Sequence, residues 1–275
     1  MASSEIARLK NRKKNRKDIN DIYENRKQSY VIHYSCESFY KEGLTTNQSV
    51  RITSIGVRNL DSAQTHSWSI YTSAELKECV NSIEENLDML EKAMLDKYFS
   101  FMEKHDECKF IHWNMRDQTY GFQALEHRYE VLKGKPYIIQ DNNKYDLARI
   151  LVALYGIHYA PHKSQSGRKG RLMSLVEMNK IADQDALEGA GEARAFEQKD
   201  FLKLHRSTLR KLDILANIFD RIHANKLKTN SSFADKYGFH PIVIVELIKS
   251  HPLFIFIVFI GVVLVSLQRY YNFFN

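Results

Sequence analysis

Alternating apolar and polar residues in the first quarter of the chain predict β-strands. Residues 30–37 have strand composition, and residues 50–57 and 65–71 alternate with a period of two. The turn-forming residues 59–62 separate the last two segments, which favours a hairpin. We therefore expect three consecutive strands at the start of an α/β fold.

Helical spacing replaces this alternation from residue 73. Apolar residues recur every three or four positions and Ser73 is a candidate N-cap, which predicts one long helix over 73–105. A short apolar run at 109–111 leads into helical spacing through 132, so a strand should run directly into a helix. The same spacing predicts further helices over 145–155, 172–181 and 201–225.

The strand–helix unit at 109–132 carries polar residues just after its strand. His112, Asn114 and Asp117 follow the apolar run and should lie at the edge of the sheet. Ligands of open α/β sheets bind at that edge, so these side chains are candidates for a site. The alternative is that Asn114 or Asp117 caps the next helix, because Asn and Asp are preferred caps.

The C-terminal part of the chain has the pattern of a membrane span. Leu253–Leu267 contains no charged residue, and a span needs roughly 20 apolar residues with a lower bound near 17. Snorkelling of Arg269 and the aromatic residues that follow would complete the length. A buried core helix is the alternative, but the run has no polar face. We therefore expect a transmembrane helix over 251–275.

Basic residues predict the orientation of that helix. Lys226, Lys228, Lys236 and Lys249 precede the run, whereas only Arg269 follows it. Lys and Arg are biased toward the cytoplasmic side, so the large domain should be cytoplasmic on a single-pass inner (cytoplasmic) membrane protein. The three cysteines are far apart without zinc-binding spacing, which fits a reducing compartment.

The net charge of +7 and the pI near 9.1 favour a polyanionic partner, either nucleic acid or an acidic membrane surface. Two basic segments, 8–17 and 163–171, are the candidates for phosphate contacts. The alternative for 8–17 is a solvated basic arm. The alternative for 163–171 is a mobile surface loop, because no P-loop spacing is present. The candidate nucleic-acid-binding residues are Lys10, Arg12, Lys13, Lys14, Arg16, Lys17, Lys163, Arg168, Lys169 and Arg171.

The order of these segments resembles that of the DEDD 3′–5′ exonucleases, which have an RNase H-like fold. The resemblance covers about residues 30–200 and includes the Gly- and Ala-rich segment 189–196. In that family an Asp-x-Glu ends the first strand, and a second Asp follows a His-Asn after a later strand. A final Asp lies in an Ala-rich helix, five residues after a general-base His. The four carboxylates hold two divalent metal ions that activate water and stabilise the leaving oxygen.

Three carboxylates of this chain match those motifs. Glu37 matches the Glu of the first motif, Asp117 ends the second as His-Trp-Asn-Met-Arg-Asp, and Glu192 in Gly-Glu-Ala-Arg-Ala matches the last. The chain departs from the family at Ser35, which replaces the first Asp, and at Leu187, which replaces the His. The resemblance implies that Glu37, Asp117 and Glu192 are catalytic residues and ligands of Mg²⁺ or Mn²⁺.

Two functions remain open at this point. One is a membrane-tethered exonuclease-like protein that engages nucleic acid and cuts it with Mg²⁺ or Mn²⁺. The other is a catalytically inactive sensor on the same fold, which binds nucleic acid or a partner protein and acts through the membrane helix. By analogy, either suits a bacterial anti-phage or abortive-infection system. A pore-forming homo-oligomer built on the C-terminal helix is a third possibility.

The expected architecture is α/β. An RNase H-like mixed sheet flanked by helices is followed by a long helix and a C-terminal transmembrane helix. The predicted division of the chain is a basic N-terminal arm at 1–29, an exonuclease-like domain with helical extension at 30–228, a linker and juxtamembrane segment at 229–250, and the membrane helix at 251–275.

Overall fold

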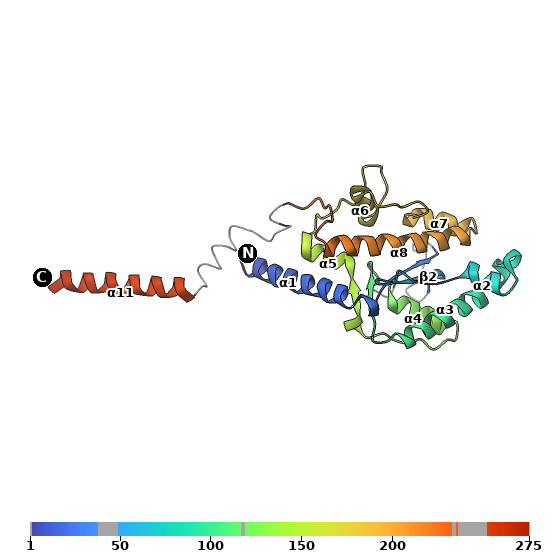
Figure 1. Ribbon diagram of the computed structural model, residues 1–275, viewed down its shortest axis with the longest axis horizontal. Helices are drawn as coiled ribbons and strands as arrows, with labels where there is room; N and C mark the ends of the chain where they lie inside the picture. Colours follow the sequence, from blue (N-terminus) through green and yellow to red (C-terminus); the bar gives the residue numbers. More distant parts are fainter. Residues whose placement is uncertain (1, 38–48, 117–118, 233–234, 236–251, 275) are drawn as a thin grey trace.

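A mixed sheet of five strands forms the centre of the fold (Figure 1). This computed structural model describes residues 2–37, 49–116, 119–232, 235 and 252–274. Within these residues the strand order is β3-β2-β1-β4-β5. The predicted α/β class, with a mixed sheet flanked by helices, is therefore confirmed.

The first three strands are antiparallel neighbours. β1 (Ser29–Cys36) pairs with β2 (Ile52–Asn59), and β2 pairs with β3 (Thr65–Ser69), which confirms the three predicted strands and the hairpin. β4 (Lys109–His112) runs parallel to β1, and β5 (Lys144–Asp146) runs parallel to β4. β5 takes the first residues of the predicted helix, because the Asp146 side chain caps that helix and delays its start.

Helices cover both faces of the sheet. Successive side chains of β1 and β4 point to opposite faces and therefore pack into two different cores. Val31 and Ile111 join one core with α1 (Ala2–Glu24), α5 (Leu147–Tyr155), α6 (Arg171–Asn179) and α8 (Phe201–His223). Ile32 and Phe110 join a second core with α3 (Leu87–Lys104) and α4 (Phe122–Val131) on the other face. Both faces are thus buried, as expected where parallel strands are present.

The predicted helix over 73–105 is wrong in its first part. Helix α2 (Ile70–Leu76) begins earlier, because Ser69 and not Ser73 is its N-cap and accepts the Thr72 N–H at 3.0 Å. Two short 3-10 turns, η2 (Val80–Ser82) and η3 (Glu84–Asn86), then separate α2 from α3. The spacing of apolar residues continues through these turns, so the pattern alone does not reveal the break.

Helix α1 lies against the α/β body. Ile19 and Ile22 are fully buried in the core that α5 and α8 share, and the Tyr23 ring stacks on His223 at a centroid distance of 3.5 Å. Helix α1 continues through these residues to Glu24. The proposed domain boundaries remain predictions. The second half of the predicted N-terminal arm nevertheless packs as an integral part of the α/β body.

Helix α8 approaches the sheet closely above β2. A Cβ atom built on Gly56 would lie 2.6 Å from Cδ1 of Leu212, which is closer than a carbon–carbon contact allows. Glycine therefore allows the helix backbone to approach the strand closely.

The other helices that the structure describes are η1 (Arg26–Gln28), η4 (Asp141–Asn143), α7 (Gly189–Glu197) and α11 (Pro252–Phe274). Helix α7 packs against α8.

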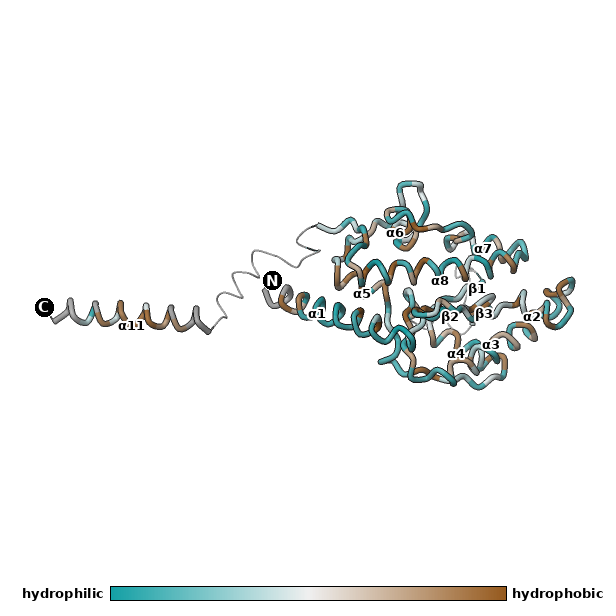
Figure 2. The backbone as a smooth tube through the Cα atoms, in the orientation of Figure 1, coloured by the Kyte–Doolittle hydropathy of each residue, from teal (hydrophilic) through white to brown (hydrophobic). Residues whose placement is uncertain are grey.

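The last helix, α11, exposes apolar side chains where the structure describes them. Phe259 is 64% exposed and Leu264 is 60% exposed. Figure 2 shows hydrophobic residues along its middle and hydrophilic residues along much of α1. Among the described residues, no helix is both long enough and apolar enough to cross a membrane.

The close approach at Gly56 leads to the first prediction. Gly56→Ala should lower the free energy of unfolding by about 1–3 kcal/mol, because the added methyl forces Leu212 or α8 to move in a packed core. Urea denaturation of the full chain measures the loss. Gly189→Ala is the matched control, since a Cβ at Gly189 would meet nothing within 4 Å. Equal stability of Gly56→Ala and wild type would contradict this account of the α8 contact.

Candidate functional site

The carboxyl end of β1 meets α7 and α8 at a buried polar cluster. Ser35 lies near the end of β1, is 1% exposed, and stands where the exonuclease resemblance expects an Asp. Glu192 comes from α7, and Lys211 comes from the sheet-facing side of α8. Three elements that are distant in the sequence therefore bring their polar residues to one point. We refer to Ser35, Glu192, Ser207, Thr208 and Lys211 as the β1-end cluster.

Glu192 is the acceptor at the centre of the β1-end cluster. Its Oε1 atom accepts hydrogen bonds from Lys211 Nζ at 2.7 Å, from Ser35 Oγ at 2.8 Å and from Ser207 Oγ at 3.0 Å. The side chains of Lys211 and Glu192 are only 7% and 14% exposed. A buried ion pair supported by additional hydrogen bonds is strongly oriented, and removal of either partner leaves an uncompensated charge.

Hydroxyl groups extend the cluster along the sheet. Ser35 Oγ lies 2.9 Å from Thr208 Oγ1, and Thr208 also hydrogen-bonds with Ser54 on β2. Thr208 donates in turn to the Leu204 carbonyl of its own helix at 3.2 Å. The polar groups between α8 and the sheet are thus joined to each other within a mainly apolar contact.

The groups around the cluster have pKa values that favour their neutral forms. Burial, with a smaller effect from the Lys211 charge, holds the pKa of His33 well below its usual range. Burial raises the pKa of Cys36 well above its usual range, and the charges of Glu192 and Glu37 add to this effect. Burial likewise raises the pKa of Tyr120. Lys211 and Glu192 therefore form an ion pair among neighbours whose neutral forms are favoured.

Of the three predicted metal ligands, the structure brings Glu192 and Glu37 to the same end of β1. Glu37 directly follows the strand, its N–H donates to the Arg51 carbonyl at 3.0 Å, and its side chain is half-buried. Glu37 is the residue after Cys36 at the end of β1, and Glu192 accepts from Ser35, the residue before Cys36. Asp117 lies outside the described residues, so its place relative to the other two stays a prediction.

The polar residues that follow β4 are close to the sheet edge, as the sequence predicts. His112 is 3% exposed, and its Nδ1 accepts the Met115 N–H at 3.2 Å. Asn114 has a φ of 57° and its side chain accepts from Arg116 at 2.9 Å, so it shapes the turn after the strand. Gly121 precedes α4 as its N-cap, which excludes Asn114 as the cap of that helix.

A pair of divalent metal ions does not fit the described residues of this cluster as they are placed. Oε1 of Glu192 already accepts from the Lys211 ammonium group, and Ser35 brings a hydroxyl donor to the same oxygen. A hard cation prefers several anionic oxygen ligands and would have to displace the ammonium. Within the described ranges, no group of three or more His, Cys, Asp and Glu side chains is arranged to hold a metal ion.

Sequence reasoning missed Lys211, although the pattern contained a signal. Leu204, Thr208, Lys211 and Leu215 follow each other at spacings of three and four, so the two polar residues fall on the core-facing stripe of α8. A lysine on such a stripe is rarely buried without a partner. Leu187, which stands at the family's histidine position, donates its backbone N–H to Ser207 at 3.1 Å and so supports the cluster.

Another buried carboxylate, Glu91, has a structural role on the opposite face of the sheet. It is fully buried and accepts from Arg128 at 2.6 and 2.8 Å, from Arg51 at 2.8 Å and from the Ile52 N–H at 2.7 Å. A bidentate pair of this kind fixes α3 and α4 against the start of β2. Both carboxylate oxygens of Glu91 therefore already have hydrogen-bond partners.

The ten predicted nucleic-acid-binding residues separate into two groups. Lys10, Lys13, Lys14 and Lys17 are exposed and lie at helical positions i, i+3, i+4 and i+7, so they share one face of α1. We call these four residues the lysine stripe. The arginines on the other face hold the helix in place, because Arg16 donates to the Ile222 carbonyl at 2.9 Å and the neighbouring Arg8 pairs with Asp235 at 2.8 Å.

Arg12 belongs with these arginines, because its charge acts on Tyr155 of α5. Burial raises the pKa of Tyr155, and the positive charges of Arg16 and Arg12 oppose that rise. In the second basic segment, Lys163 and Lys169 are exposed and face each other across a short bridge. Arg168 hydrogen-bonds with Asp183 and with the Ala186 carbonyl, so it stabilises the loop. Arg171 begins α6, and its guanidinium lies 5.3 Å from the centre of the Tyr159 ring.

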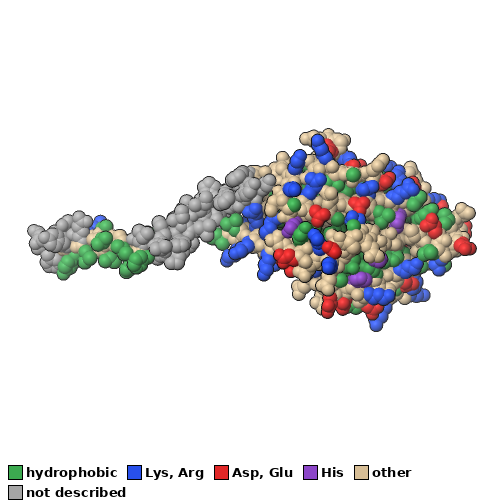
Figure 3. Space-filling view, viewed as in Figure 1, with side chains coloured by type: hydrophobic (Ala, Val, Ile, Leu, Met, Phe, Trp, Pro, Cys, Tyr) green, Lys and Arg blue, Asp and Glu red, His purple; other side chains and the backbone are tan. Residues whose placement is uncertain are grey.

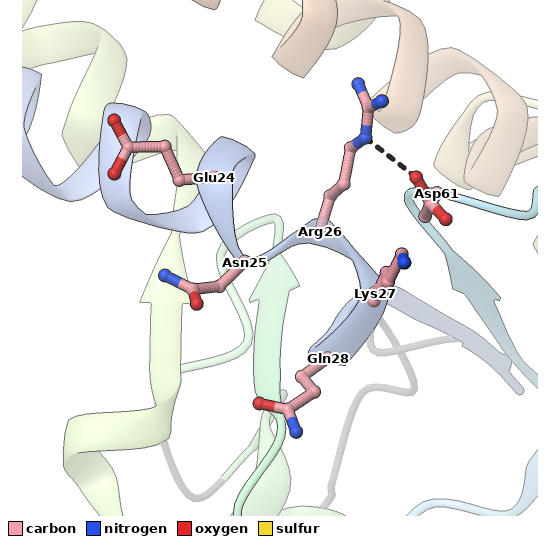
Figure 4. Close-up of a pocket in the computed structure, with 6 residues that line it drawn as sticks. All are labelled: Glu24, Asn25, Arg26, Lys27, Gln28 and Asp61. Atoms are coloured by element: carbon pink, nitrogen blue, oxygen red, sulfur yellow. Dashed lines mark hydrogen bonds and ion pairs between the residues drawn. The ribbon is translucent and has the colours of Figure 1, made fainter.

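Two hollows on the described surface differ in chemistry. The first, of about 410 Å³, lies where α1 leads into β1 and is lined by Glu24, Asn25, Arg26, Lys27, Gln28 and Asp61. Figure 4 shows that Arg26 and Asp61 face each other there, with an ion pair of 2.8 Å. Its charges are mixed and its arginine is engaged. The second hollow, beyond the carboxyl end of β4, is lined by three arginines and is taken up below.

Comparisons with known proteins assign no family to the chain. No protein-family model matches it, and no curated protein matches it closely enough to be named as a relative. The resemblance to the DEDD exonucleases therefore rests on the residues and on the order of elements alone.

The Lys211–Glu192 pair leads to the second prediction. Lys211→Met should lower the free energy of unfolding by roughly 3 kcal/mol, because a buried carboxylate loses its counter-ion. The double variant Lys211→Met/Glu192→Gln should lose less than the sum of the single losses, since the two residues are coupled. Denaturation of the four proteins gives the coupling free energy.

Asp141→Asn is the control for this cycle. Asp141 pairs with Lys144 at 2.9 Å but its side chain is 96% exposed, so the change should cost below about 1 kcal/mol. Additive losses in the Lys211 and Glu192 variants would show that the two residues do not act as a buried pair.

Proposed function

We propose that this chain is a membrane-tethered, nucleic-acid-binding module on an RNase H-like fold, and that it binds without cutting. The observation that carries the proposal is the ion pair between Lys211 and Glu192. It places an ammonium group beside the carboxylate that the exonuclease resemblance assigns to a metal ion. A bound ammonium neutralises that carboxylate but supplies no activated water.

The topology supports the RNase H-like part of the proposal. Three antiparallel strands are followed by two strands parallel to the first, and helices cover both faces. Ser35, Glu37 and Glu192 all lie at the carboxyl end of β1 or against it, as the resemblance requires. The departures at Ser35 and Leu187 are consistent with a retained fold that has lost its chemistry.

The lysine stripe supports a polyanionic ligand. Lys14 pairs with Asp18, yet its side chain is 74% exposed, and the other three lysines are exposed on the same face of α1. Figure 3 shows Lys and Arg side chains gathered at the end of the body where α1 lies. The face opposite the stripe is buried against α5 and α8, so α1 presents charge to a ligand and does not insert an apolar face into lipid.

The third prediction tests this surface through its salt dependence. Replacement of Lys10, Lys13, Lys14 and Lys17 by Gln should weaken binding of single-stranded and double-stranded oligonucleotides. It should also reduce the slope of log K (the association constant) against log salt concentration by up to about 3–4 in magnitude, because each lost phosphate contact releases fewer counterions. Fluorescence anisotropy of labelled oligonucleotides at several salt concentrations measures both effects.

The matched control removes the same charge elsewhere. Lys77, Lys97, Lys104 and Lys133 are also exposed, and their replacement by Gln should leave the salt slope nearly unchanged. An equal change in both quadruple variants would mean that net charge alone attracts nucleic acid. Stripe-dependent binding to anionic vesicles but not to oligonucleotides would assign the stripe to a membrane surface and refute the nucleic-acid proposal.

The membrane tether is a proposal that rests on the sequence of α11. The charge-free run of this helix is Leu253–Leu267. The structure describes the side chains of only part of this run, and the large apolar ones among them are exposed. Exposed Phe, Ile, Val and Leu side chains on one helix need an apolar environment to cover them. We propose that this environment is the bilayer and that the α/β body stays on the cytoplasmic side.

The fourth prediction concerns this tether. Ile260→Arg should cost roughly 2–3 kcal/mol of insertion and shift the protein out of the membrane fraction. Truncation after Ser250 should release the body in a folded form, and Val258→Leu serves as the control that should remain in the membrane. Detergent-free solubility of the full chain would contradict the tether, as would unfolding of the truncated body.

A metal-dependent nuclease, which would serve an anti-phage or abortive-infection role by analogy, is the second candidate. It is favoured by the positions of Glu37, which directly follows β1, and of Glu192, which accepts from Ser35 near the end of that strand. The fifth prediction follows: if the protein degrades oligonucleotides with Mg²⁺ or Mn²⁺, Glu37→Gln should abolish the degradation, because a hard cation needs that charge. Wild-type protein that binds oligonucleotides and leaves them intact removes this candidate.

A further inference from the structure

The hollow beyond the carboxyl end of β4 is a built pocket of about 430 Å³. Its walls come from the turn after β4, the first half of α5, the residues between α5 and α6, and the beginning of α6. Three arginines bring charge to it, and six apolar side chains line it together with Asn114, His162 and Gly170. The lining residues are Trp113, Asn114, Arg116, Ala148, Arg149, Val152, Ile157, Tyr159, His162, Gly170, Arg171 and Leu172.

The positive charge of this pocket exceeds its negative charge. Arg116 pairs with Asp146 at 3.1 Å, and the Asp146 side chain is 8% exposed, so that carboxylate neutralises one of the three guanidinium groups. Arg149 is exposed, and within the described residues no carboxylate pairs with it or with Arg171. An anion that enters the pocket would therefore meet two guanidinium groups that are not engaged by an acid.

The beginning of α6 adds donors at the same place. Gly170 is its N-cap, has a φ of 101° and gives the helix no side-chain cap, and a Cβ at that position would meet nothing within 4 Å. The first N–H groups of a helix are natural partners for phosphate oxygens when no side chain caps them. By contrast, the first turn of α5 is already capped, because Asp146 accepts from Ala148 at 3.0 Å.

Arg171 stands at the edge of the pocket beside an aromatic ring. Its guanidinium carbon lies 5.3 Å from the centre of the Tyr159 ring, which is the distance of a cation–π contact. The Nε atom is buried and has no hydrogen-bond partner within the described residues. The Arg171 side chain as a whole is only half-buried and lines the hollow, so its charge is available to an anion there.

The apolar part of the pocket suits a flat ring. Val152 and Ile157 line the pocket and remain 38% and 58% exposed. Trp113 also lines the pocket and is half-buried. Nucleobases stack on aromatic and apolar side chains in sites that recognise unpaired nucleotides. A phosphate beside an apolar wall is the chemical pattern of a nucleotide and not of an inorganic anion alone.

We propose that this pocket binds a nucleoside monophosphate group, with the phosphate at Arg149, Arg171 and the first turn of α6 and the base against Trp113, Val152 and Ile157. The inference rests on the proposed nucleic-acid function and deepens it, because it names the part of the polymer that is recognised. Two sources share this chemistry, the phosphorylated end of a strand and a free mononucleotide. The lysine stripe would hold the backbone, whereas the pocket would hold one nucleotide.

Tryptophan fluorescence of the full chain in detergent tests the pocket directly. The chain has two tryptophans, so Trp68→Phe leaves Trp113 as the only reporter. Adenosine 5′-monophosphate should quench this fluorescence, whereas adenosine and inorganic phosphate should bind at least tenfold more weakly. Arg149→Gln and Arg171→Gln should each weaken binding of the monophosphate about tenfold, because each removes a charge-assisted hydrogen bond.

Arg206→Gln is the matched control, since Arg206 is exposed on α8 and does not line the pocket. Arg149→Gln keeps the test valid if Arg171→Gln fails to fold, because Arg149 is a surface residue. A 5′-phosphorylated dinucleotide that binds more tightly than the monophosphate would assign the pocket to strand ends, and equal affinity would assign it to free mononucleotides.

Three results would overturn the inference: no response to the monophosphate at millimolar concentration, equal affinity for inorganic phosphate, or unchanged affinity in both arginine variants. The lysine-stripe variant separates this outcome from failure of the proposed function. It should bind the monophosphate like wild type. Unchanged oligonucleotide binding by this variant, together with intact monophosphate binding, would refute the stripe and leave the pocket standing.

Discussion

The contact of α8 with the sheet is the constraint on which the rest of this structure depends. Gly56 removes the side chain that would keep the helix away from β2, and apolar residues of α8 fill the core beneath. Lys211 is carried into this contact by the helix and must find a counter-ion there, since a buried ammonium without a partner is costly. Glu192 of α7 is that counter-ion and also accepts from Ser35, so this one carboxylate connects α7 with α8 and with β1.

This arrangement explains why the protein is proposed to bind nucleic acid and not to cut it. A metal site of the exonuclease type needs carboxylates that are free of other cations, whereas Glu192 already accepts from Lys211, Ser35 and Ser207. Ser35 suits this arrangement, because its hydroxyl donates to Glu192 where a carboxylate would repel it. Ser35, Glu192 and Lys211 thus fit together as one polar cluster.

Much of the fold follows from the apolar pattern, and its failures have identifiable causes. The alternation at 50–57 and 65–71 predicts the hairpin, and the three- and four-residue spacing after Phe201 predicts α8. The break between α2 and α3 is hidden because apolar spacing continues through the 3-10 turns at 80–86. β5 is hidden because it has only three residues, Lys144–Asp146, and leads straight into α5.

The candidate site was only partly predictable, for a different reason. Glu37 and Glu192 are found through motifs with local spacing, but Lys211 is recognised only when its helix is placed against the sheet. The basic segment at 8–17 shows the same limit, because charge alone does not distinguish the arginines that hold α1 in place from the lysines that face outward. Helical periodicity separates the two sets once the buried positions of Ile19 and Ile22 are known.

The measurement that tests the central claim most directly is a titration of the full-length protein with Mn²⁺, followed by electron paramagnetic resonance of the free ion, at pH 7 and low salt. The account predicts that wild type binds no stoichiometric Mn²⁺ at the β1-end cluster, because the Lys211 ammonium holds the Glu192 carboxylate. Lys211→Met, which removes the ammonium, is the informative comparison. Stoichiometric Mn²⁺ binding by wild type that is lost in Glu192→Gln would contradict the account and restore the metal-dependent enzyme.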